Sequence, residues 1–322
     1  MLNTIQAPVR DEMQRFNELL LGEYRNDNPF IATITDYVMQ RRGKQMRPLL
    51  VMLSAALNGG VTDRSYTGAI LVEMAHTASL VHDDVIDEAK MRRGQPSVNA
   101  LWQSRTAVLV GDYLLARALS LTARQEATDL LGMLIESFEL LCEGELIQLD
   151  HASKLDMTEE LYYDVIRRKT ASLLGSCGAI GAKSAGAPDE AVGQMKRFGE
   201  YIGMAFQVKD DLLDYEPSGD TGKMACNDLK EQKITLPLLY LLNNSTPAEK
   251  EELTEKIRSL RDHEEEVAYL QQKVIASGGM AYAEQVMRDY EQKALDILAG
   301  YPESEVRKSL ELYCRFILER KK

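Results

Sequence analysis

The chain has 322 residues, and its 38 lysines and arginines against 50 aspartates and glutamates give a formal net charge of −12. A surface this acidic disfavours nucleic acid or an anionic membrane as a general partner, and the total alone also disfavours a phosphorylated substrate. The hydrophobic content of 45% and the charged content of 27% fit a globular chain with a large core, and they exclude disordered, collagen and coiled-coil classes.

The cysteines and the apolar stretches indicate the compartment. Cys142, Cys177, Cys226 and Cys314 form no C-x-x-C pair, so neither a disulfide framework nor a zinc ribbon is expected. The N-terminal segment lacks the apolar core of a signal peptide. The longest apolar stretches contain Glu73 or end in aspartates, which argues against a transmembrane helix. We therefore expect a cytoplasmic protein with no membrane span.

Apolar residues recur at intervals of three and four along almost the whole chain, for example over 130–148. This spacing predicts roughly ten or more helices and no sheet. Breaks between the predicted helices fall at 58–60, 93–96, 186–188, 216–219, 243–247 and 277–279. None of these breaks resembles a flexible interdomain linker. The sequence therefore predicts one all-α domain over residues 1–322.

Two predicted helices, 69–86 and 198–213, are apolar nearly all round, as is typical of central helices in a bundle. Each ends in the pattern D-D-x-x-D, at 83–87 and at 210–214. Residues four apart share a helix face, so Asp83 lies above Asp87 and Asp210 above Asp214. The middle aspartates, Asp84 and Asp211, point about 100° away from that face.

Two carboxylates on one helix face repel each other unless a cation lies between them. Oxygen ligands suit hard ions, which favours Mg²⁺ over Ca²⁺, and Mg²⁺ commonly shares its coordination shell with substrate phosphates. Acidic helix ends that simply face solvent are the alternative. Two copies of the pattern, each ending an apolar helix, make that alternative the weaker one.

Basic residues follow or precede both aspartate motifs. They form islands at 41–47, at 92–94 and at 167–170, with Lys223, Lys230 and Lys233 after the second motif. Arginine and lysine at such positions favour phosphate binding. His76 lies two turns before Asp83 on the same face, where it could reach a second anion. No G-x-x-x-x-G-K-[ST], H-E-x-x-H or G-x-S-x-G pattern is present.

In these motifs and their order the sequence resembles the trans-isoprenyl diphosphate synthases, over nearly its whole length. The resemblance is carried by GKQMRP (43–48), LVHDDVIDEAKMRRG (80–94), RRKTASL (167–173), FQVKDDLLDYEPSGDTGK (206–223) and KITLPL (233–238). It implies an isoprenoid synthase-type helical bundle, usually a homodimer, with a central cavity lined by both aspartate motifs. It also implies about two or three Mg²⁺ ions that bridge to an allylic diphosphate.

The resemblance assigns roles to individual residues. Asp83, Asp87 and Asp210 look like metal ligands, with Asp84 and Asp214 in the same two motifs. The contacts of the allylic diphosphate would be Arg92, Lys169, Thr170, Gln207, Lys223 and Lys233. The isopentenyl diphosphate site would consist of Lys44, Arg47, His76 and Arg93. The implied reaction is ionisation of the allylic diphosphate, condensation with isopentenyl diphosphate and loss of a proton.

Two residues depart from the family pattern. Cys226 and Gln232 stand where the family commonly has glycines around the second aspartate motif. They put the geometry of the loop at the allylic site in doubt rather than the class of reaction.

The residues before the first motif bear on the length of the product. Ala78 and Ser79 lie about one turn before Asp83 and are small, whereas short-chain members of the family tend to have a bulky aromatic there. The resemblance therefore implies a pocket for a long all-trans chain of roughly C35 to C50, made from farnesyl or geranylgeranyl diphosphate, for a quinone side chain. Phe138 is a candidate for the floor of the cavity, and an ordinary core role is at least as good an interpretation.

Three other interpretations stay open. The chain could be a short-chain farnesyl or geranylgeranyl diphosphate synthase. It could be a class I terpene cyclase, although cyclases normally replace the second D-D-x-x-D and lack the isopentenyl site. It could also be a subunit of a hetero-oligomeric synthase.

With an acidic total charge, any peripheral membrane contact for product release should be apolar.

Overall fold

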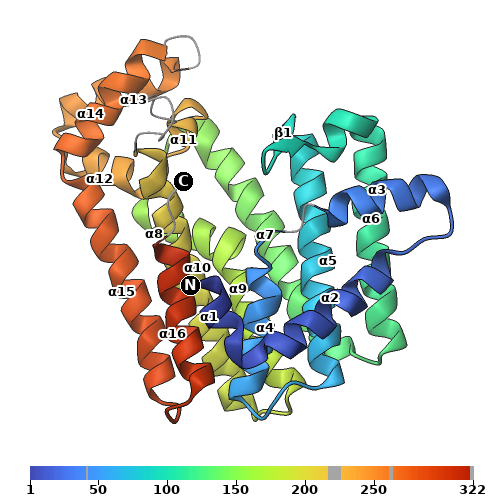
Figure 1. Ribbon diagram of the computed structural model, residues 1–322. Coiled ribbons are helices and arrows are strands. Elements are labelled where there is room, and N and C mark those ends of the chain that lie inside the picture. The colour runs from blue at the N-terminus through green and yellow to red at the C-terminus, as the bar shows by residue number, and fades with distance from the viewer. Residues whose placement is uncertain (41–42, 217–225, 261–263, 320–322) are drawn as a thin grey trace. The chain divides into compact units, whose positions relative to one another are not determined.

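The structure is a computed structural model that describes residues 1–40, 43–216, 226–260 and 264–319. Within these ranges the chain consists of helices joined by short connections, together with one two-stranded hairpin (Figure 1). The all-α prediction is confirmed. The prediction of no sheet at all is wrong at residues 91–96, for a local reason given below.

The chain forms two compact units. The first comprises Met1–Ile135, Ser176–Lys196 and Glu303–Leu310, and the second comprises Glu136–Gly175, Arg197–Pro302 and Glu311–Lys322. Four helices contribute to both units, namely α7 (Thr128–Lys154), α9 (Ser172–Ser184), α10 (Asp189–Asp214) and α16 (Glu305–Leu318). A single domain over residues 1–322 stays a prediction.

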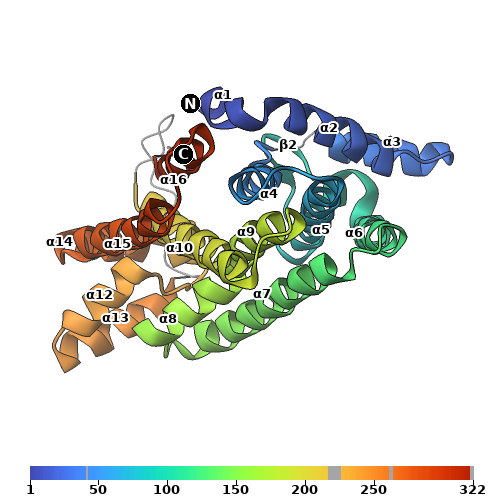
Figure 2. The same ribbon diagram turned by 90° about the horizontal axis from the view of Figure 1, so that it is seen from below.

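The first unit is built around α5 (Asp63–Ile86), which lies between α4 (Met46–Leu57) and α6 (Val98–Arg124) (Figure 2). Its other elements are α1 (Leu2–Gln6), the 3₁₀ turn Ala7–Val9, α2 (Arg10–Tyr24), α3 (Pro29–Met39), β1 (Met91–Arg92) and β2 (Gln95–Pro96). A capping box between Thr62 and Ser65 starts α5 by satisfying its first backbone N–H groups. Nearly every residue of α5 from 67 to 75 is buried, which confirms the predicted central helix.

The hairpin forms where the sequence predicts a connection between helices. Arg93 and Gly94 both have positive φ, 52° and 75°, and they join two antiparallel strands of two residues each. A two-residue hairpin loop with both central residues at positive φ matches the right-handed twist of its strands. The R-G pair was therefore the signal for a tight turn rather than for an ordinary helix connection.

The second unit contains the remaining parts of the four shared helices and seven further elements. These are α8 (Glu159–Ile166), the π-helical turn η2 (Arg167–Ala171), α11 (Asn227–Lys230), α12 (Leu236–Asn244), α13 (Pro247–Ser259), α14 (Glu264–Ala276) and, closing the unit, α15 (Gly279–Ala299). Insertions of the π type are rare and often lie at functional positions, and η2 carries Lys169 and Thr170.

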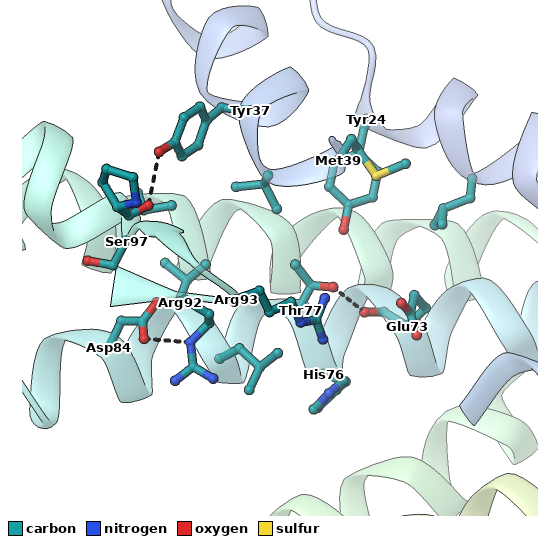
Figure 3. A pocket seen from close by; sticks show the side chains of 16 residues that line it. Tyr24, Tyr37, Met39, Glu73, His76, Thr77, Asp84, Arg92, Arg93 and Ser97 are labelled. Carbon is teal, nitrogen blue, oxygen red and sulfur yellow. Dashed lines mark hydrogen bonds and ion pairs between the residues drawn. The ribbon is translucent and has the colours of Figure 1, made fainter. Parts of the chain in front are cut away.

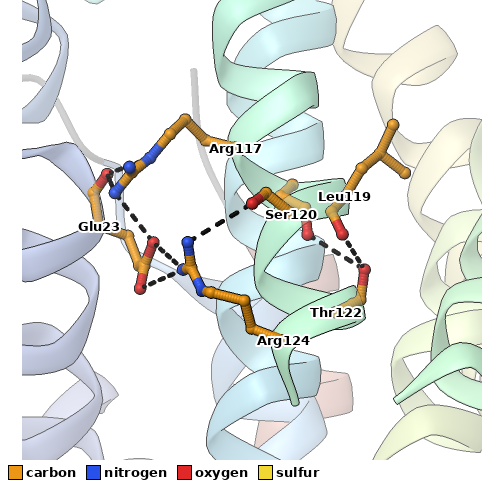
Figure 4. Close-up of polar contacts among 7 residues, drawn as sticks. Glu23, Arg117, Leu119, Ser120, Thr122 and Arg124 are labelled. Carbon is orange, nitrogen blue, oxygen red and sulfur yellow. Dashed lines mark hydrogen bonds and ion pairs between the residues drawn. The ribbon is translucent and has the colours of Figure 1, made fainter. Parts of the chain in front are cut away.

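In the described part of the chain, α6 is the one helix that is long and apolar enough to cross a membrane by length and composition alone. It packs along α5 and is joined to α2 by ion pairs. Glu23 accepts hydrogen bonds from Arg117 at 3.0 Å and from Arg124 at 3.0 Å (Figure 4). These contacts account for α6 as a packed helix of the first unit.

Within the second unit, α9 and α10 approach each other at Gly199 of α10. A Cβ atom at Gly199 would lie 2.1 Å from the carbonyl oxygen of Leu174 and 2.8 Å from the backbone nitrogen of Gly175. Both neighbours are backbone atoms, so they cannot turn aside as a side chain could.

We expect Gly199→Ala to lower the free energy of unfolding by about 1–3 kcal/mol, because the added methyl must push two helix backbones apart. Gly132→Ala in α7 is the matched control, since nothing lies within 4 Å of its added Cβ atom. That control should be neutral or stabilise the protein by up to about 1 kcal/mol. Thermal unfolding followed by circular dichroism measures both. Equal midpoints for the two variants would contradict the close approach.

Candidate functional site

The first unit contains a pocket between α5, the ends of α2 and α3, and the hairpin (Figure 3). Four of the residues singled out in the sequence line it, namely His76, Asp84, Arg92 and Arg93. Tyr24, Tyr37, Glu73 and Thr77 line it as well. The structure therefore brings together one member of the first aspartate motif, both arginines that follow it and the histidine that precedes it.

The pocket uses one face of α5. Glu73, Thr77, Leu80 and Asp84 are spaced four, three and four residues apart, so their side chains form one stripe along the helix. The outer aspartates of the motif belong to a neighbouring face. Asp83 is partly buried, and Asp87 is exposed and caps the C-terminus of α5. The predicted rotation between the middle and outer aspartates is confirmed.

Asp84 is almost completely buried and forms an ion pair with Arg92. The Nε atom of Arg92 donates to Oδ1 of Asp84 at 2.6 Å, and the Asp84 side chain is 3% exposed. Burial raises the pKa of Asp84, and the Arg92 guanidinium opposes that shift. The resemblance assigned Asp84 to metal and Arg92 to the allylic diphosphate. In the structure the two side chains form an ion pair with each other, and both assigned roles stay predictions.

Two of the residues expected to bind isopentenyl diphosphate, Arg47 and Arg93, act electrostatically on a buried carboxylate, Glu73. Burial raises the pKa of Glu73, while the charges of Arg47 and Arg93 oppose the shift. The Nε atom of Arg47 is buried and has no hydrogen-bond partner among the described residues. The guanidinium of Arg93 lies against Gly43, where a Cβ atom would come within 2.6 Å of it. Lys44, the fourth expected residue of this group, is exposed.

His76 is expected to be neutral near pH 7. Burial, followed by the positive charges of Arg47, Arg93 and Arg92, lowers its pKa well below the usual value. A neutral imidazole can still donate one hydrogen bond to an anion, so His76 would act as a neutral donor beside cationic arginines.

A separate pocket lies within the second unit, beside the second aspartate motif. It is lined by Gln148, Met157, Tyr162, Val165, Ile166, Lys169, Gln207, Asp211, Asp228, Lys233, Ile234 and Thr235. Three of the residues expected to contact the allylic diphosphate, Lys169, Gln207 and Lys233, thus share one pocket. The hydroxyl of another of the six, Thr170, donates to Oε1 of Gln207 at 2.8 Å.

The middle aspartate is again the buried one in the second motif. Asp211 is 2% exposed, and it accepts hydrogen bonds from the Tyr162 hydroxyl at 2.7 Å and from Nε2 of Gln207 at 3.1 Å. Burial raises the pKa of Asp211 to about 7, although both hydrogen bonds favour the ionised form.

Asp210 and Asp214 are both partly buried. The two carboxylate oxygens of Asp214 accept from the backbone N–H groups of Asn227 and Asp228, each at 3.0 Å. Asp214 therefore holds the start of α11, a role that the sequence did not suggest. Among the described residues, no group of three or more His, Cys, Asp or Glu side chains is arranged to hold a metal by itself.

The two departures from the family pattern occupy left-handed backbone. Cys226 has a φ of 38° and Gln232 a φ of 60°. Glycine adopts this region without steric cost, whereas a residue with a Cβ atom is strained there by about 1–2 kcal/mol. Nε2 of Gln232 donates to the carbonyls of Ile257 and Arg258 at 3.0 and 2.9 Å, which offsets part of that cost. Lys223, also expected near the allylic substrate, lies outside the described residues.

The structure gives the surroundings of the three residues that the sequence linked to product length. Ala78 is fully buried in α5, and the Ser79 hydroxyl donates to the carbonyl of His76 at 2.8 Å. Phe138 is partly buried in α7. Their roles in setting chain length stay predictions.

Sequence reasoning missed Glu73, Tyr162 and Asp228 as residues that line the two pockets. Glu73 carried a signal, because a charged residue inside an otherwise apolar helix needs a partner. Tyr162 and Asp228 carried none, because only the packing of α8 and α11 brings them beside Lys169 and Lys233.

Comparison with known proteins gives full-length matches. The sequence profile of the family described as "Polyprenyl synthetase" matches residues 28–274. The octaprenyl diphosphate synthase of Haemophilus influenzae is 35% identical over 96% of this chain and 94% of its own length. Component 2 of the heptaprenyl diphosphate synthase of Geobacillus stearothermophilus is 35% identical over 97% of this chain and 98% of its own.

A solved structure agrees with these matches. The polyprenyl synthase of Caulobacter crescentus, crystallised in complex with calcium and isoprenyl diphosphate, superimposes with a TM-score of 0.90. It is 32% identical to this chain, and the match covers 100% of this chain and 98% of the other.

We expect Arg92→Met to lower the free energy of unfolding by about 1–3 kcal/mol, because it leaves the buried Asp84 carboxylate without its donor. The loss should shrink when Asp84→Asn is already present, since the two residues then no longer form an ion pair. Urea unfolding without added metal measures this cycle. Arg64→Met is the control, because the Arg64–Asp129 pair is exposed and should contribute less than about 1 kcal/mol. Additive losses for Arg92 and Asp84 would refute the ion pair.

Proposed function

Because the chain belongs to the polyprenyl synthetase family, we propose that it is an all-trans polyprenyl diphosphate synthase. It would condense isopentenyl diphosphate onto an allylic diphosphate primer, farnesyl or geranylgeranyl diphosphate. The observation that carries the proposal is the pocket of the second unit, where Lys169, Gln207 and Lys233 gather beside the second aspartate motif. Two ammonium groups and an amide around one cavity suit a diphosphate bound together with a divalent cation.

The donor set fits Mg²⁺. Every candidate ligand is a carboxylate oxygen, which hard divalent cations prefer. Asp83, Asp87 and Asp210 are the proposed ligands, because they match the metal-binding positions of the family's two aspartate motifs. Asp84, Asp211 and Asp214 accept hydrogen bonds or an ion pair within the protein. Three carboxylates cannot complete the shells of two or three ions, so diphosphate oxygens and water would supply the rest. Bound Mg²⁺ would neutralise the charge of the leaving diphosphate.

The protein's own residues would divide the remaining work. Lys169 and Lys233 would bind the allylic diphosphate and stabilise its charge as its carbon–oxygen bond breaks. Arg47 and Arg93, with neutral His76 as a hydrogen-bond donor, would hold isopentenyl diphosphate in the first unit. The double bond of that substrate would attack the allylic cation, and a proton would then leave. The departed diphosphate is the proposed base.

Two observations support a long product. The relatives described above act, by their names, in octaprenyl and heptaprenyl diphosphate synthesis. Ala78 and Ser79 are small, so no bulky side chain of α5 stands one turn before Asp83. We therefore assign a product of roughly C35 to C50, suited to a quinone side chain, because pocket size limits the chain that it can hold.

We also assign a cytoplasmic location and a homodimer. Leu101, Val108, Leu109 and Leu119 of α6 are exposed, between 41% and 60% each, and would be covered by a second copy. The similarity to a component of a two-component synthase makes a required partner subunit the alternative. Sedimentation of the pure protein distinguishes a dimer from a monomer, and activity without any second protein excludes a required partner.

We expect purified protein with farnesyl diphosphate, labelled isopentenyl diphosphate and Mg²⁺ to incorporate label into long prenyl chains. Chromatographic sizing of the products checks this. Label confined to short chains would instead indicate a short-chain synthase, and conversion of farnesyl diphosphate into a hydrocarbon would indicate a terpene cyclase.

Asp83→Ala should reduce turnover at least about a thousandfold, because it removes a proposed metal ligand. Asp189→Ala, which removes a carboxylate that is 93% exposed at the start of α10, should leave turnover unchanged. Substantial activity in Asp83→Ala would rule out its role as a ligand.

If Phe138 forms the floor of the cavity, Phe138→Ala will lengthen the product by at least one isoprene unit, because the chain gains room to grow. The same sizing assay measures this, with Phe30→Ala as a control at an exposed phenylalanine. An unchanged product distribution would leave Phe138 as an ordinary core residue.

A further inference from the structure

A chain of hydrogen bonds runs through the pocket of the second unit. The Tyr162 hydroxyl on α8 donates to Oδ2 of Asp211 at 2.7 Å. Nε2 of Gln207, one turn earlier on α10, donates to Oδ1 of the same carboxylate at 3.1 Å. The Thr170 hydroxyl on η2 donates to Oε1 of Gln207 at 2.8 Å. We call these four residues the Tyr162 relay.

The relay fixes which way the Gln207 amide faces. A carboxylate accepts hydrogen bonds, so the NH₂ group of Gln207 must face Asp211 and its oxygen must face Thr170. Flipping the amide would set two oxygens against each other at one end. The second N–H of Gln207 forms no hydrogen bond within the described part of the chain, and Gln207 lines the pocket.

The relay is buried at its far end. Tyr162 is 4% exposed and Asp211 is 2% exposed, so water cannot readily replace the tyrosine hydroxyl as a donor. One carboxylate therefore joins α8 and α10 in the wall of the pocket.

From this geometry we infer that Tyr162 and Asp211 are positioning residues for the allylic diphosphate. They hold the Gln207 amide with one N–H directed to Asp211 and the other available to a diphosphate oxygen. Both would act on the substrate through the Gln207 amide. The inference rests on the proposed function, and it adds two residues that no feature of the sequence singled out for this role.

Removing the tyrosine hydroxyl separates this role from simple packing. Tyr162→Phe keeps the ring and leaves Oδ2 of Asp211 short of a donor. The carboxylate then turns toward its remaining donor and the Gln207 amide loses its fixed orientation. We therefore expect weaker binding of the allylic substrate, because Gln207 belongs to the proposed allylic site. Binding of isopentenyl diphosphate should not change, because its proposed site consists of residues of the first unit.

The neighbouring tyrosine is a matched control. Tyr163 also donates a hydrogen bond through its hydroxyl, to Glu159 at 3.1 Å, but it does not line the pocket. Tyr163→Phe therefore makes the same chemical change, one residue away, outside the relay.

We expect Tyr162→Phe to raise the KM for farnesyl diphosphate by about tenfold, the effect of losing roughly one hydrogen bond to a charged group. The KM for isopentenyl diphosphate should stay within about twofold, and Tyr163→Phe should change neither value. Equal increases in both KM values, or the same result for both variants, would overturn the inference.

Binding without turnover provides a second readout. Calorimetric titration with Mg²⁺ and farnesyl thiolodiphosphate, an unreactive analogue, should show the same weakening in Tyr162→Phe. An inactive wild-type protein would defeat the proposed function. If the wild-type protein is active and Tyr162→Phe binds the analogue as tightly as wild type, the positioning role of the Tyr162 relay is wrong but the proposed function stands.

A double-mutant cycle tests whether Tyr162 acts through the amide. Gln207→Met removes the amide and keeps the side-chain length, so adding Tyr162→Phe to it should raise the KM for farnesyl diphosphate no further. Additive increases would contradict the relay. If Tyr162→Phe does not fold, Thr170→Val loosens the same amide from its other side and should raise the same KM, and an unchanged value would again refute the relay.

Discussion

The arrangement of both candidate sites depends on burying one carboxylate at the middle of each aspartate motif. A buried carboxylate is costly unless donors surround it, and each motif meets that demand differently. Asp84 binds Arg92 of the hairpin, whereas Asp211 binds the hydroxyl of Tyr162 and the amide of Gln207. In each case the second aspartate anchors the helix end, and the first and last project from another face. The different environments of the middle and outer aspartates in D-D-x-x-D thus follow from helix geometry and the cost of desolvation.

Local charge, rather than the total, decides what these pockets suit. The chain carries a net charge of −12, yet each pocket contains cationic side chains beside its carboxylates. In the first unit the buried Glu73 partly balances the positive charges of Arg47 and Arg93, which lowers the repulsion between the two guanidinium groups. A diphosphate that binds there would find cationic side chains already gathered around the pocket.

The sequence could predict much of the site because many of its polar residues lie close together in the chain, at spacings that a single helix or turn explains. Aspartates four apart on a helix, and arginines directly after them, need no tertiary information to be recognised. It could not predict which aspartates would be engaged inside the protein. Asp214 binds the backbone of α11, and that contact exists only because residues 227 and 228 return to the end of α10. The hairpin and the left-handed residues Cys226 and Gln232 were similarly hidden, since backbone conformation at a turn depends on what the flanking segments contact.

By itself, the sequence determined the helical class, the central position of α5 and the identity of the polar residues around both aspartate motifs. Apolar periodicity and the four-residue spacing of carboxylates are properties of a single helix, and they are legible without any neighbour. Only the tertiary structure decided the partners of Asp84, Asp211 and Asp214, and only it brought Glu73 and Tyr162 into the pockets. The physical reason is that a side chain's desolvation and its hydrogen-bond donors come from whichever elements pack against it, and those elements lie far away in the sequence.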